Sequence, residues 1–217
     1  MMDRILRRLF YCLVLWPVAL FVLGLNLRHR ERLPVKGPAI VAANHNSHLD
    51  ALVLLSLFPF SAIDRVRPVA AADYFLSNRA LAWFSTRILN ILPLVREPHG
   101  RERGEDKLAT SVAALERGEI LIVFPEGSRG DPEVMTRFKG GVARLKERVP
   151  IAPVVPVFLH GLGKALPKGE VVLVPFFIDI FIGHEVPWIG NRAAFTAALE
   201  DSVRQLAAEF AGAGVRP

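Results

Sequence analysis

The chain has 217 residues, of which 27 are basic and 21 acidic, giving a net charge of +6 and a pI near 10.0. This length suits one globular domain with an accessory segment, and the positive charge favours an anionic partner such as nucleic acid or an anionic membrane. With 52% hydrophobic residues and a mean hydropathy of +0.33, the composition argues against a nucleic-acid-binding module, while the single cysteine, Cys12, excludes an internal disulfide.

An uncharged run covers residues 9–27, and as a helix it would be roughly 29 Å long, about the thickness of a bilayer's hydrocarbon core. Basic residues flank both ends, so they indicate no orientation, and Pro17 is expected to kink the helix. A cleaved signal peptide is the alternative, but no small-x-small cleavage site precedes Arg28. We therefore expect residues 1–30 to form a membrane anchor, spanning or re-entrant, and residues 31–217 to form the globular domain.

Strand-like and helix-like segments alternate after the anchor. The predicted strands are 38–43, 66–72, 91–95, 119–124, 151–158, 171–174 and 177–182, and the predicted helices are 49–57, 74–89, 105–117 and a last one capped by Asn191. Some strands are apolar throughout, which is typical of strands covered on both faces. The pattern predicts an α/β fold, with a mostly parallel mixed sheet flanked by helices.

A polar motif at residues 44–50 lies between two apolar runs. Ser47, with Asp50 three residues later, is typical of a helix N-cap with a capping box. His45 then lies just before the helix, so that its imidazole can fold back toward the Asp50 carboxylate. Such a pair makes a general base. Since no GxSxG motif lies nearby and Cys12 is inside an apolar run, we expect the nucleophile to come from the substrate.

Two other interpretations of this motif stay open. Asp50 can simply cap the helix while His45 is a loop histidine without a catalytic role. Alternatively, His45, His48 and Asp50 can be metal ligands, although no further Cys or His cluster completes the set.

Basic residues follow three of the apolar segments. Arg129 lies in the glycine-containing loop 124–130, Lys139 follows downstream, and Arg96 ends the segment 91–95. Ligands of open α/β sheets gather beyond the carboxyl ends of the strands, so the three cations can converge on one anion, for which an arginine offers a planar fork. The alternative is that each is a solvated loop charge.

At this point the chain resembles the glycerolipid acyltransferase family that includes the 1-acylglycerol-3-phosphate acyltransferases. The resemblance covers roughly residues 39–156. It is carried by Asn44, His45 and Asp50, by residues 124–130 with Ser128 in place of Thr, by Phe138, Lys139 and Gly141, and by an apolar run ending at Pro156. The family's second block is altered: this chain keeps Arg96 but lacks the Phe and Asp, which leaves the acceptor open.

The resemblance implies transfer of a fatty acyl group from acyl-CoA or acyl carrier protein to a lysolipid hydroxyl. The first acceptor that it implies is 1-acylglycerol 3-phosphate, whose acylation would give phosphatidic acid. His45 would remove the hydroxyl proton and Asp50 would orient the ring, while backbone amides near the helix start would stabilise the oxyanion. The implied substrate-binding residues are Arg96, Glu126, Gly127, Ser128, Arg129 and Lys139. No cofactor is implied beyond the thioester co-substrate.

Other functions compete with this one. The acceptor can be another lysophospholipid, a lyso-ornithine lipid or glycerol 3-phosphate, or the chain can be a non-catalytic lipid-binding membrane protein. The expected location is a bacterial inner membrane with the catalytic domain on the cytoplasmic side. The expected partners are the bilayer, the lysolipid and the acyl thioester, with acyl carrier protein as one carrier and no nucleic acid.

Overall fold

The computed structural model describes residues 2–72, 78–94, 106–128, 130–165 and 176–212. Within these residues a seven-stranded sheet runs in the order β1-β7-β6-β2-β5-β3-β4. The strands are β1 (Gly24–Arg28), β2 (Ala39–Ala43), β3 (Val66–Ala71), β4 (Leu92–Leu94), β5 (Ile120–Val123), β6 (Val154–His160) and β7 (Phe177–Ile182). Neighbouring strands are parallel except for the antiparallel pair β6–β7. The prediction of a mostly parallel mixed sheet is confirmed.

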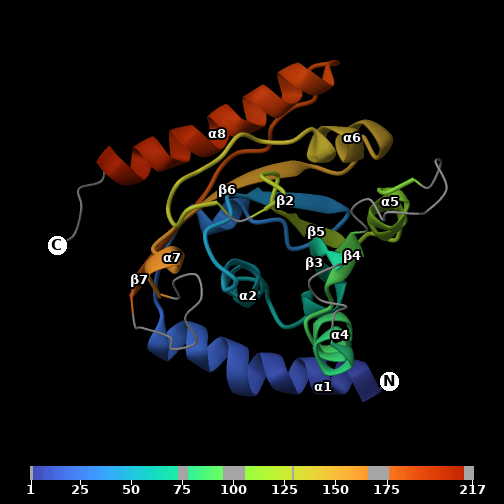
Figure 1. The fold of residues 1–217 in the computed structure, drawn as a ribbon, viewed down its shortest axis with the longest axis vertical. Coiled ribbons are helices and arrows are strands. Elements are labelled where there is room, and N and C mark those ends of the chain that lie inside the picture. The colour runs from blue at the N-terminus through green and yellow to red at the C-terminus, as the bar shows by residue number, and fades with distance from the viewer. Residues whose placement is uncertain (1, 73–77, 95–105, 129, 166–175, 213–217) are drawn as a thin grey trace.

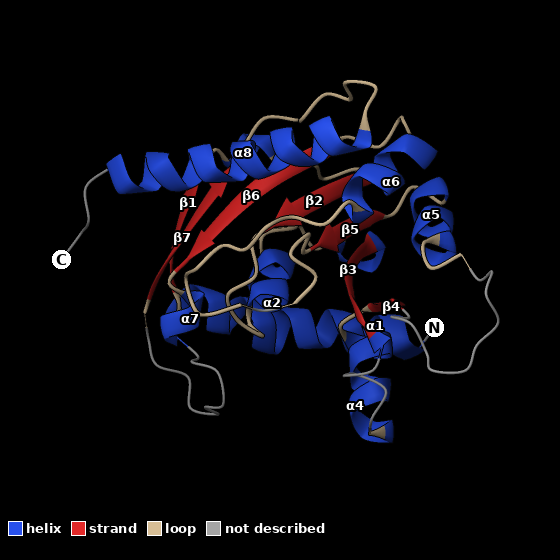
Figure 2. Ribbon diagram, turned by 45° about the horizontal axis from the view of Figure 1, so that its top comes forward, coloured by secondary structure: helices blue, strands red, loops and turns tan. Residues whose placement is uncertain are grey.

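Helices cover both faces of the sheet (Figures 1 and 2). They are α1 (Met2–Phe10), extended by the π-helical turns Tyr11–Leu15 and Val18–Val22; α2 (Asp50–Ser56); α4 (Arg79–Trp83), extended by the π-helical turn Phe84–Ile88; α5 (Ala109–Glu116); α6 (Gly141–Arg148); α7 (Leu162–Ala165); and α8 (Arg192–Gly212). Short 3₁₀ turns lie at Arg30–Arg32 and Ile63–Arg65. Figure 1 shows α8 and α6 on one side of the sheet and α1 and α2 on the other.

The apolar strands have a core on each side. In β2, Val41 packs into the core shared with α2, whereas Ile40 packs into the core shared with α8. All five residues of β2 are buried. Two covered faces explain why this strand is apolar throughout instead of alternating.

The N-terminal apolar run is only partly helical. The helix ends at Val22, and residues 24–28 form β1, which pairs with β7 in the register Gly24↔Phe177. Gly24 allows this approach, because a Cβ at that position would lie 2.7 Å from the Phe177 ring. The expectation of helix through residue 27 is therefore wrong, and the sheet includes five residues that the sequence assigned to the anchor.

Four predicted segments lie partly or wholly outside the described residues. These are the strand 171–174, the first part of the helix 74–89, of which Arg79–Ile88 is helical, the last residue of the strand 91–95 and the first residue of the helix 105–117. The remaining predicted elements are present, with bounds shifted by a few residues.

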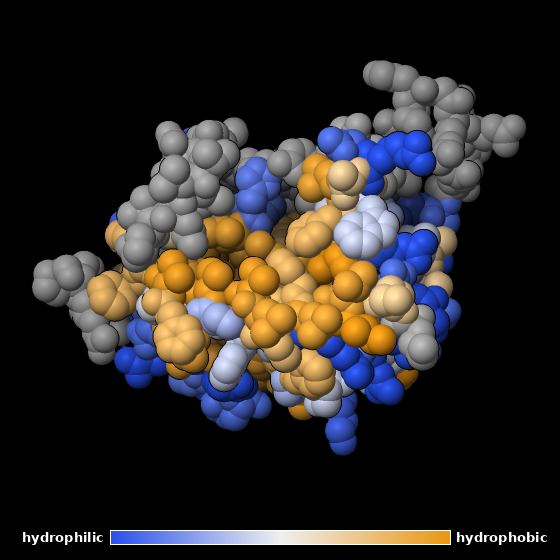
Figure 3. Space-filling view, turned by 90° about the horizontal axis from the view of Figure 1, so that it is seen from below, coloured by the Kyte–Doolittle hydropathy of each residue, from blue (hydrophilic) through white to orange (hydrophobic). Residues whose placement is uncertain are grey.

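The N-terminal helix lies along the body of the protein (Figure 1). Asp64 pairs with Arg7 at 3.3 Å and with Arg8 at 2.7 Å, and the Arg7 guanidinium also donates to the Arg87 carbonyl. The Tyr11 hydroxyl donates to the Phe58 carbonyl. These contacts fix the helix to the domain, while its outer side forms the apolar surface in Figure 3. The exposed apolar residues of this helix are Met2, Ile5, Leu9, Leu13, Val14, Trp16, Leu20 and Phe21.

Candidate active site

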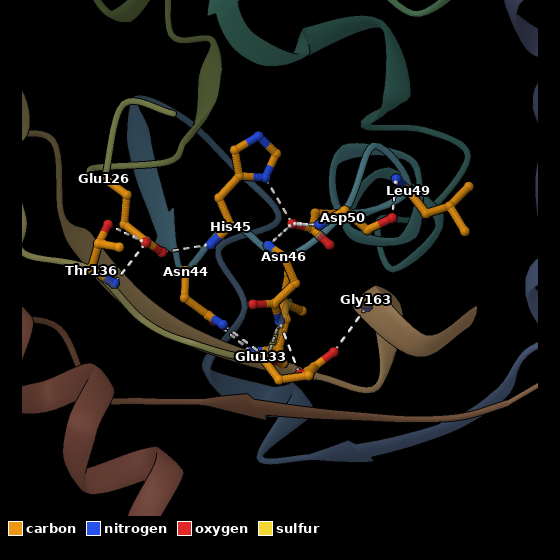
Figure 4. Close-up of polar contacts among 11 residues, drawn as sticks. Asn44, His45, Asn46, Leu49, Asp50, Glu126, Glu133, Thr136 and Gly163 are labelled. Atoms are coloured by element: carbon orange, nitrogen blue, oxygen red, sulfur yellow. Dashed lines mark hydrogen bonds and ion pairs between the residues drawn. The ribbon is translucent and has the colours of Figure 1, made fainter. Parts of the chain in front are cut away.

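Three segments that are distant in sequence meet at one edge of the sheet. Because β2, β5 and β6 are parallel neighbours, their carboxyl ends lie side by side. Residues 44–50 follow β2, the loop 124–139 follows β5, and His160 ends β6. Figure 4 shows the resulting cluster of polar side chains. This is the edge at which open α/β sheets bind ligands.

His45 and Asp50 form the predicted pair. Nδ1 of His45 lies 2.8 Å from Oδ2 of Asp50, and the same oxygen accepts the backbone N–H of Asn46 at 2.6 Å and of Ser47 at 2.9 Å. The prediction of Ser47 as the N-cap is wrong: α2 begins at Asp50, its N-cap residue is Leu49, and no side chain caps it, although the Ser47 N–H bonds the Asp50 carboxylate as in a capping box. The Ser47 hydroxyl accepts the Leu49 N–H at 3.4 Å. The first helical residue of α2 thus holds the preceding loop through two N–H groups and contacts the histidine through the same oxygen.

The two members of the pair differ in exposure. The Asp50 side chain is 0% exposed, whereas the His45 side chain is 20% exposed. Burial raises the pKa of Asp50, although the hydrogen bonds from His45, Ser47 and Asn46 act in the opposite direction. Its second oxygen, Oδ1, has no hydrogen-bond partner among the described residues. A substrate can therefore reach the imidazole but not the carboxylate, and Nε2 of His45 points away from Asp50 (Figure 4).

An aromatic side chain directly after the neighbouring strand β5 orients the imidazole. The His45 ring stacks on Phe124, with ring centroids 4.1 Å apart and an interplanar angle of 16°. Phe124 was part of the motif that carried the resemblance, but the sequence did not indicate this role, because the contact depends on the register between β2 and β5. Together, Asp50 and Phe124 fix the position of one ring nitrogen and the plane of the ring.

Glu126 connects the two loops. It is 2% exposed; Oε1 accepts the His45 backbone N–H at 2.7 Å, and Oε2 accepts the backbone N–H and the hydroxyl of Thr136 at 2.8 and 2.6 Å. Both carboxylate oxygens are thus bound to the protein (Figure 4). These contacts give Glu126 a role in holding His45 in place, and the acceptor contact implied by the resemblance stays a prediction.

Lys139 lies next to the loop 124–130. Its backbone N–H donates to the Pro125 carbonyl at 2.8 Å. Gly127 has a φ of +75°, and a Cβ there would lie 2.9 Å from Nζ of Lys139, so the glycine makes room for the ammonium group. Ser128 and Lys139 are exposed. The two other predicted cations, Arg96 and Arg129, lie outside the described residues.

Two asparagines of the motif bind the backbone of β6. Asn44 is buried and exchanges two hydrogen bonds with Leu159, at 2.9 Å to the carbonyl and 2.7 Å from the N–H. The Asn46 amide donates to the same carbonyl at 2.8 Å. These bonds continue the pairing of β2 with β6 into the loop that carries His45.

The metal-site interpretation gains no support from the described residues. Among them, no group of three or more His, Cys, Asp or Glu side chains could hold a metal ion. His48, which that interpretation requires, is exposed at the surface.

A family model, several relatives and a solved structure are similar to this chain. A family model described as Acyltransferase matches residues 24–159, from the first residue of β1 almost to the end of β6. The 1-acyl-sn-glycerol-3-phosphate acyltransferase of Bacillus subtilis is 26% identical over 191 residues, which cover 84% of this chain and 88% of that protein. A protein named Taffazin from Dictyostelium discoideum is 26% identical over 162 residues, or 70% of this chain.

The lengths of the relatives differ from that of this chain. The match spans 56% of the Dictyostelium protein, and it spans 38% of LPAT1, a chloroplastic 1-acyl-sn-glycerol-3-phosphate acyltransferase of Arabidopsis thaliana that is 29% identical over 151 residues. The crystal structure of PlsC, the 1-acyl-sn-glycerophosphate acyltransferase of Thermotoga maritima, has the same fold. Its TM-score is 0.73 at 22% identity, over 99% of this chain and 81% of that one. Since the family model matches more than half of the residues, this chain belongs to the acyltransferase family.

Proposed function

We propose that this protein is a membrane-bound O-acyltransferase that moves a fatty acyl group from a thioester to the hydroxyl of a lysolipid. The observation that carries the proposal is the contact between Nδ1 of His45 and the buried Asp50, which leaves Nε2 as a base at an accessible position. Family membership and relatives named 1-acyl-sn-glycerol-3-phosphate acyltransferases support 1-acylglycerol 3-phosphate as the acceptor and phosphatidic acid as the product.

In the proposed mechanism, His45 carries the proton from the attacking hydroxyl to the leaving thiolate. Nε2 of His45 accepts the hydroxyl proton as the acceptor oxygen attacks the thioester carbonyl, and a tetrahedral intermediate forms. The C–S bond then breaks, and Nε2 returns the proton to the departing thiolate. Asp50 keeps the other ring proton on Nδ1 and stabilises the imidazolium while it exists. Because Asp50 is excluded from water, its attraction to that cation is stronger than at a surface.

Two backbone amides near the start of α2 are already engaged, so other groups must donate hydrogen bonds to the oxyanion of the tetrahedral intermediate. The N–H groups of Asn46 and Ser47 both donate to Asp50, so they do not point at a substrate. We therefore propose that the oxyanion donors are among the other backbone amides near the start of α2.

We assign the acceptor phosphate to the basic side of the loop 124–130. Lys139 places its ammonium beside Gly127, three residues after Phe124, on which the His45 ring stacks. Arg96 and Arg129 are proposed to complete this phosphate site, as the sequence predicted. Acceptors with other head groups would interact differently with these cations. The assay with a panel of lysolipids described below distinguishes between the acceptors.

We further propose that the protein lies on the bilayer through its N-terminal helix. Met2–Val22 is long and apolar enough to cross a membrane, and 22% of its most apolar window is buried in the protein. Since Arg7, Arg8 and Tyr11 hold the helix along the domain, we favour a helix lying in the interface, with its exposed apolar side in lipid. A cytoplasmic face is proposed for the domain because acyl-CoA and acyl carrier protein are the donors implied.

The test is an acyl-transfer assay with purified protein and a panel of lysolipids, each offered with acyl-CoA and with acyl carrier protein thioester. His45→Ala is expected to lower the rate by about 10²- to 10⁴-fold, because it removes the base. Its circular dichroism and vesicle binding should match those of the wild type. His184→Ala, which removes an exposed histidine after β7, is the matched control.

Two outcomes would contradict the proposal. An unchanged rate in His45→Ala would reject the mechanism. Failure of the wild-type protein to acylate any acceptor in the panel, while it still binds lipid, would favour the non-catalytic alternative.

A further inference from the structure

A second histidine–carboxylate pair lies beside the proposed catalytic pair. Oε2 of Glu133 lies 3.0 Å from Nδ1 of His160 and accepts the side-chain amide of Asn46 at 3.3 Å. Its other oxygen, Oε1, accepts the Gly163 N–H at 2.8 Å (Figure 4). One carboxylate therefore joins the loop after β2, the end of β6 and the helix α7.

The contact between Glu133 and the Gly163 N–H requires a positive φ at Glu133 and a glycine at position 163. Glu133 has a φ of +62°, in the left-handed region that is sterically unfavourable for residues with a Cβ other than Asn and Asp. At position 163, a Cβ would lie 2.7 Å from the Cβ of Pro132 and 3.0 Å from Oε1 of Glu133, so only glycine admits the approach. Local strain of this kind persists where the surrounding contacts determine the conformation.

The carboxylate is held in its ionised form. Burial alone would raise the pKa of Glu133, but hydrogen bonds from His160 and from the backbone of Gly161 and Gly163 outweigh this effect and place the pKa below its usual value. An ionised acceptor makes stronger hydrogen bonds than a neutral one. The contact to Asn46 is therefore made by a charged group.

Asn46 links this carboxylate to the proposed catalytic pair. Its backbone N–H donates to Oδ2 of Asp50 at 2.6 Å, and that oxygen is also the one that contacts His45. The side chain of the same asparagine is held by Glu133 and by the Leu159 carbonyl. Fixing the side chain of Asn46 thus fixes the direction of the N–H that orients the Asp50 carboxylate.

We propose that Glu133 is a positioning residue that acts through Asn46 on the Asp50 and His45 pair. The loop 124–139 then makes two hydrogen bonds to residues 44–50: Glu126 accepts the His45 backbone N–H, and Glu133 accepts the Asn46 side-chain amide. Glu133 itself needs no contact with the substrate. This proposal rests on the roles proposed above for His45 and Asp50.

The test compares Glu133→Gly, Glu133→Gln and Asp131→Asn in the full-length protein. Glycine removes the carboxylate and is compatible with a positive φ, glutamine keeps the length and one acceptor, and Asp131 is an exposed acid of the same loop that serves as control. We expect Glu133→Gly to lower kcat by about 10- to 100-fold, since small displacements of reacting groups have effects of this size. Glu133→Gln should retain more activity than Glu133→Gly, and Asp131→Asn should match the wild type.

Two further readouts distinguish positioning from a general structural role. The KM values for lysolipid and acyl thioester should stay within about twofold of the wild type, because ground-state binding is unaffected. Histidine-ring ¹⁵N NMR should show a smaller share of the Nδ1–H tautomer at His45 in Glu133→Gly, while thermal unfolding stays close to the wild type.

The proposal is overturned by a wild-type kcat in Glu133→Gly, by a rise in KM alone, or by a loss of kcat with an unchanged His45 tautomer. If Glu133→Gly does not fold, Glu133→Gln provides the same three comparisons. His45→Ala separates the two hypotheses, because an active His45→Ala variant rejects the base itself. An inactive one, together with a fully active Glu133→Gly, rejects only the positioning role.

Discussion

At Asp50, hydrogen bonding and burial act in opposite directions on one carboxylate. Three donors stabilise its ionised form, yet it is fully buried and burial raises its pKa. A raised pKa means that the folded protein binds a proton at Asp50 more readily than the unfolded chain does. Above the ordinary value of 3.8, the free energy of unfolding therefore falls as the pH rises through the raised pKa.

Asp50→Asn removes this titration, which gives a pH-dependent prediction. The difference in free energy of unfolding, variant minus wild type, should become more positive as the pH rises above 3.8 and through the raised pKa of Asp50. Acyl transfer should fall at every pH, because the imidazolium loses its counter-charge. Urea denaturation at a series of pH values measures the first effect. A difference that does not change with pH would show that Asp50 titrates alike in the folded and unfolded chains.

The candidate site was only partly predictable from the sequence. The His45 and Asp50 contact follows from local geometry, because the chain turns at residues 46–47, whose N–H groups bond the Asp50 carboxylate, and this brings residues five apart together. Stacking on Phe124 and the closure of Glu126 onto the His45 N–H depend on how β2 and β5 are aligned, which the local pattern does not contain.

Among the elements, α8 shows how a cap and an apolar stripe define a helix. Oδ1 of Asn191 accepts the N–H groups of Ala193 and Ala194 at 2.8 and 3.2 Å, as predicted for an N-cap. The apolar stripe of this helix faces the sheet: its buried members are Phe195, Leu199, Val203 and Leu206, and Phe210 packs against them from a partly exposed position.

Removal of this cap should destabilise the protein without altering its chemistry. Asn191→Ala is expected to lower the free energy of unfolding by about 1 kcal/mol, because two helical N–H groups lose their acceptor. Asn191→Asp keeps an acceptor and should stay close to the wild type. Chemical denaturation provides the comparison. Equal stability of the alanine and aspartate variants would mean that water replaces the cap at no cost.

Three elements were missed: β1, α6 and the four-residue helix α7, which is too short to show an apolar periodicity. In β1, Asn26 pairs with Asp179 of β7 at 2.6 Å, but the uncharged run 9–27 concealed a change from helix to strand within it. In α6, the glycine at its start and the buried Lys146 obscured the apolar periodicity. The Lys146 ammonium is accommodated by the carbonyls of Pro150 and Ala152, each at 3.0 Å.

At the scale of the whole molecule, the two sides of the sheet differ in surface character. The outer side of the N-terminal helix is apolar, as Figure 3 shows, whereas α8 on the opposite side alternates exposed charged and small residues. A continuous apolar face of this kind, with basic residues at both ends, is typical of proteins that lie on an anionic bilayer.

A charge placed on that face should weaken membrane binding. Phe21 is 80% exposed, and Phe21→Glu is expected to lower the partition coefficient onto phosphatidylglycerol vesicles by about tenfold or more, because a phenyl group is lost from lipid. Ile151, 78% exposed in the turn before β6, offers the matched control Ile151→Glu. Vesicle sedimentation measures both. An equal loss in the two variants would mean that no particular face contacts lipid.

The junction between the N-terminal helix and β1 consists of one buried residue, Leu23. A protein tethered by a long, loose segment could raise or lower its reactive centre above the bilayer, whereas here one buried residue connects the helix to the edge strand of the sheet. With the helix in the bilayer interface as proposed, this short connection sets the height of the imidazole above the lipid head groups. We expect such an enzyme to select acceptors by how far the free hydroxyl stands above the glycerol level, which would disfavour lysolipids whose head groups hold the protein away from the surface.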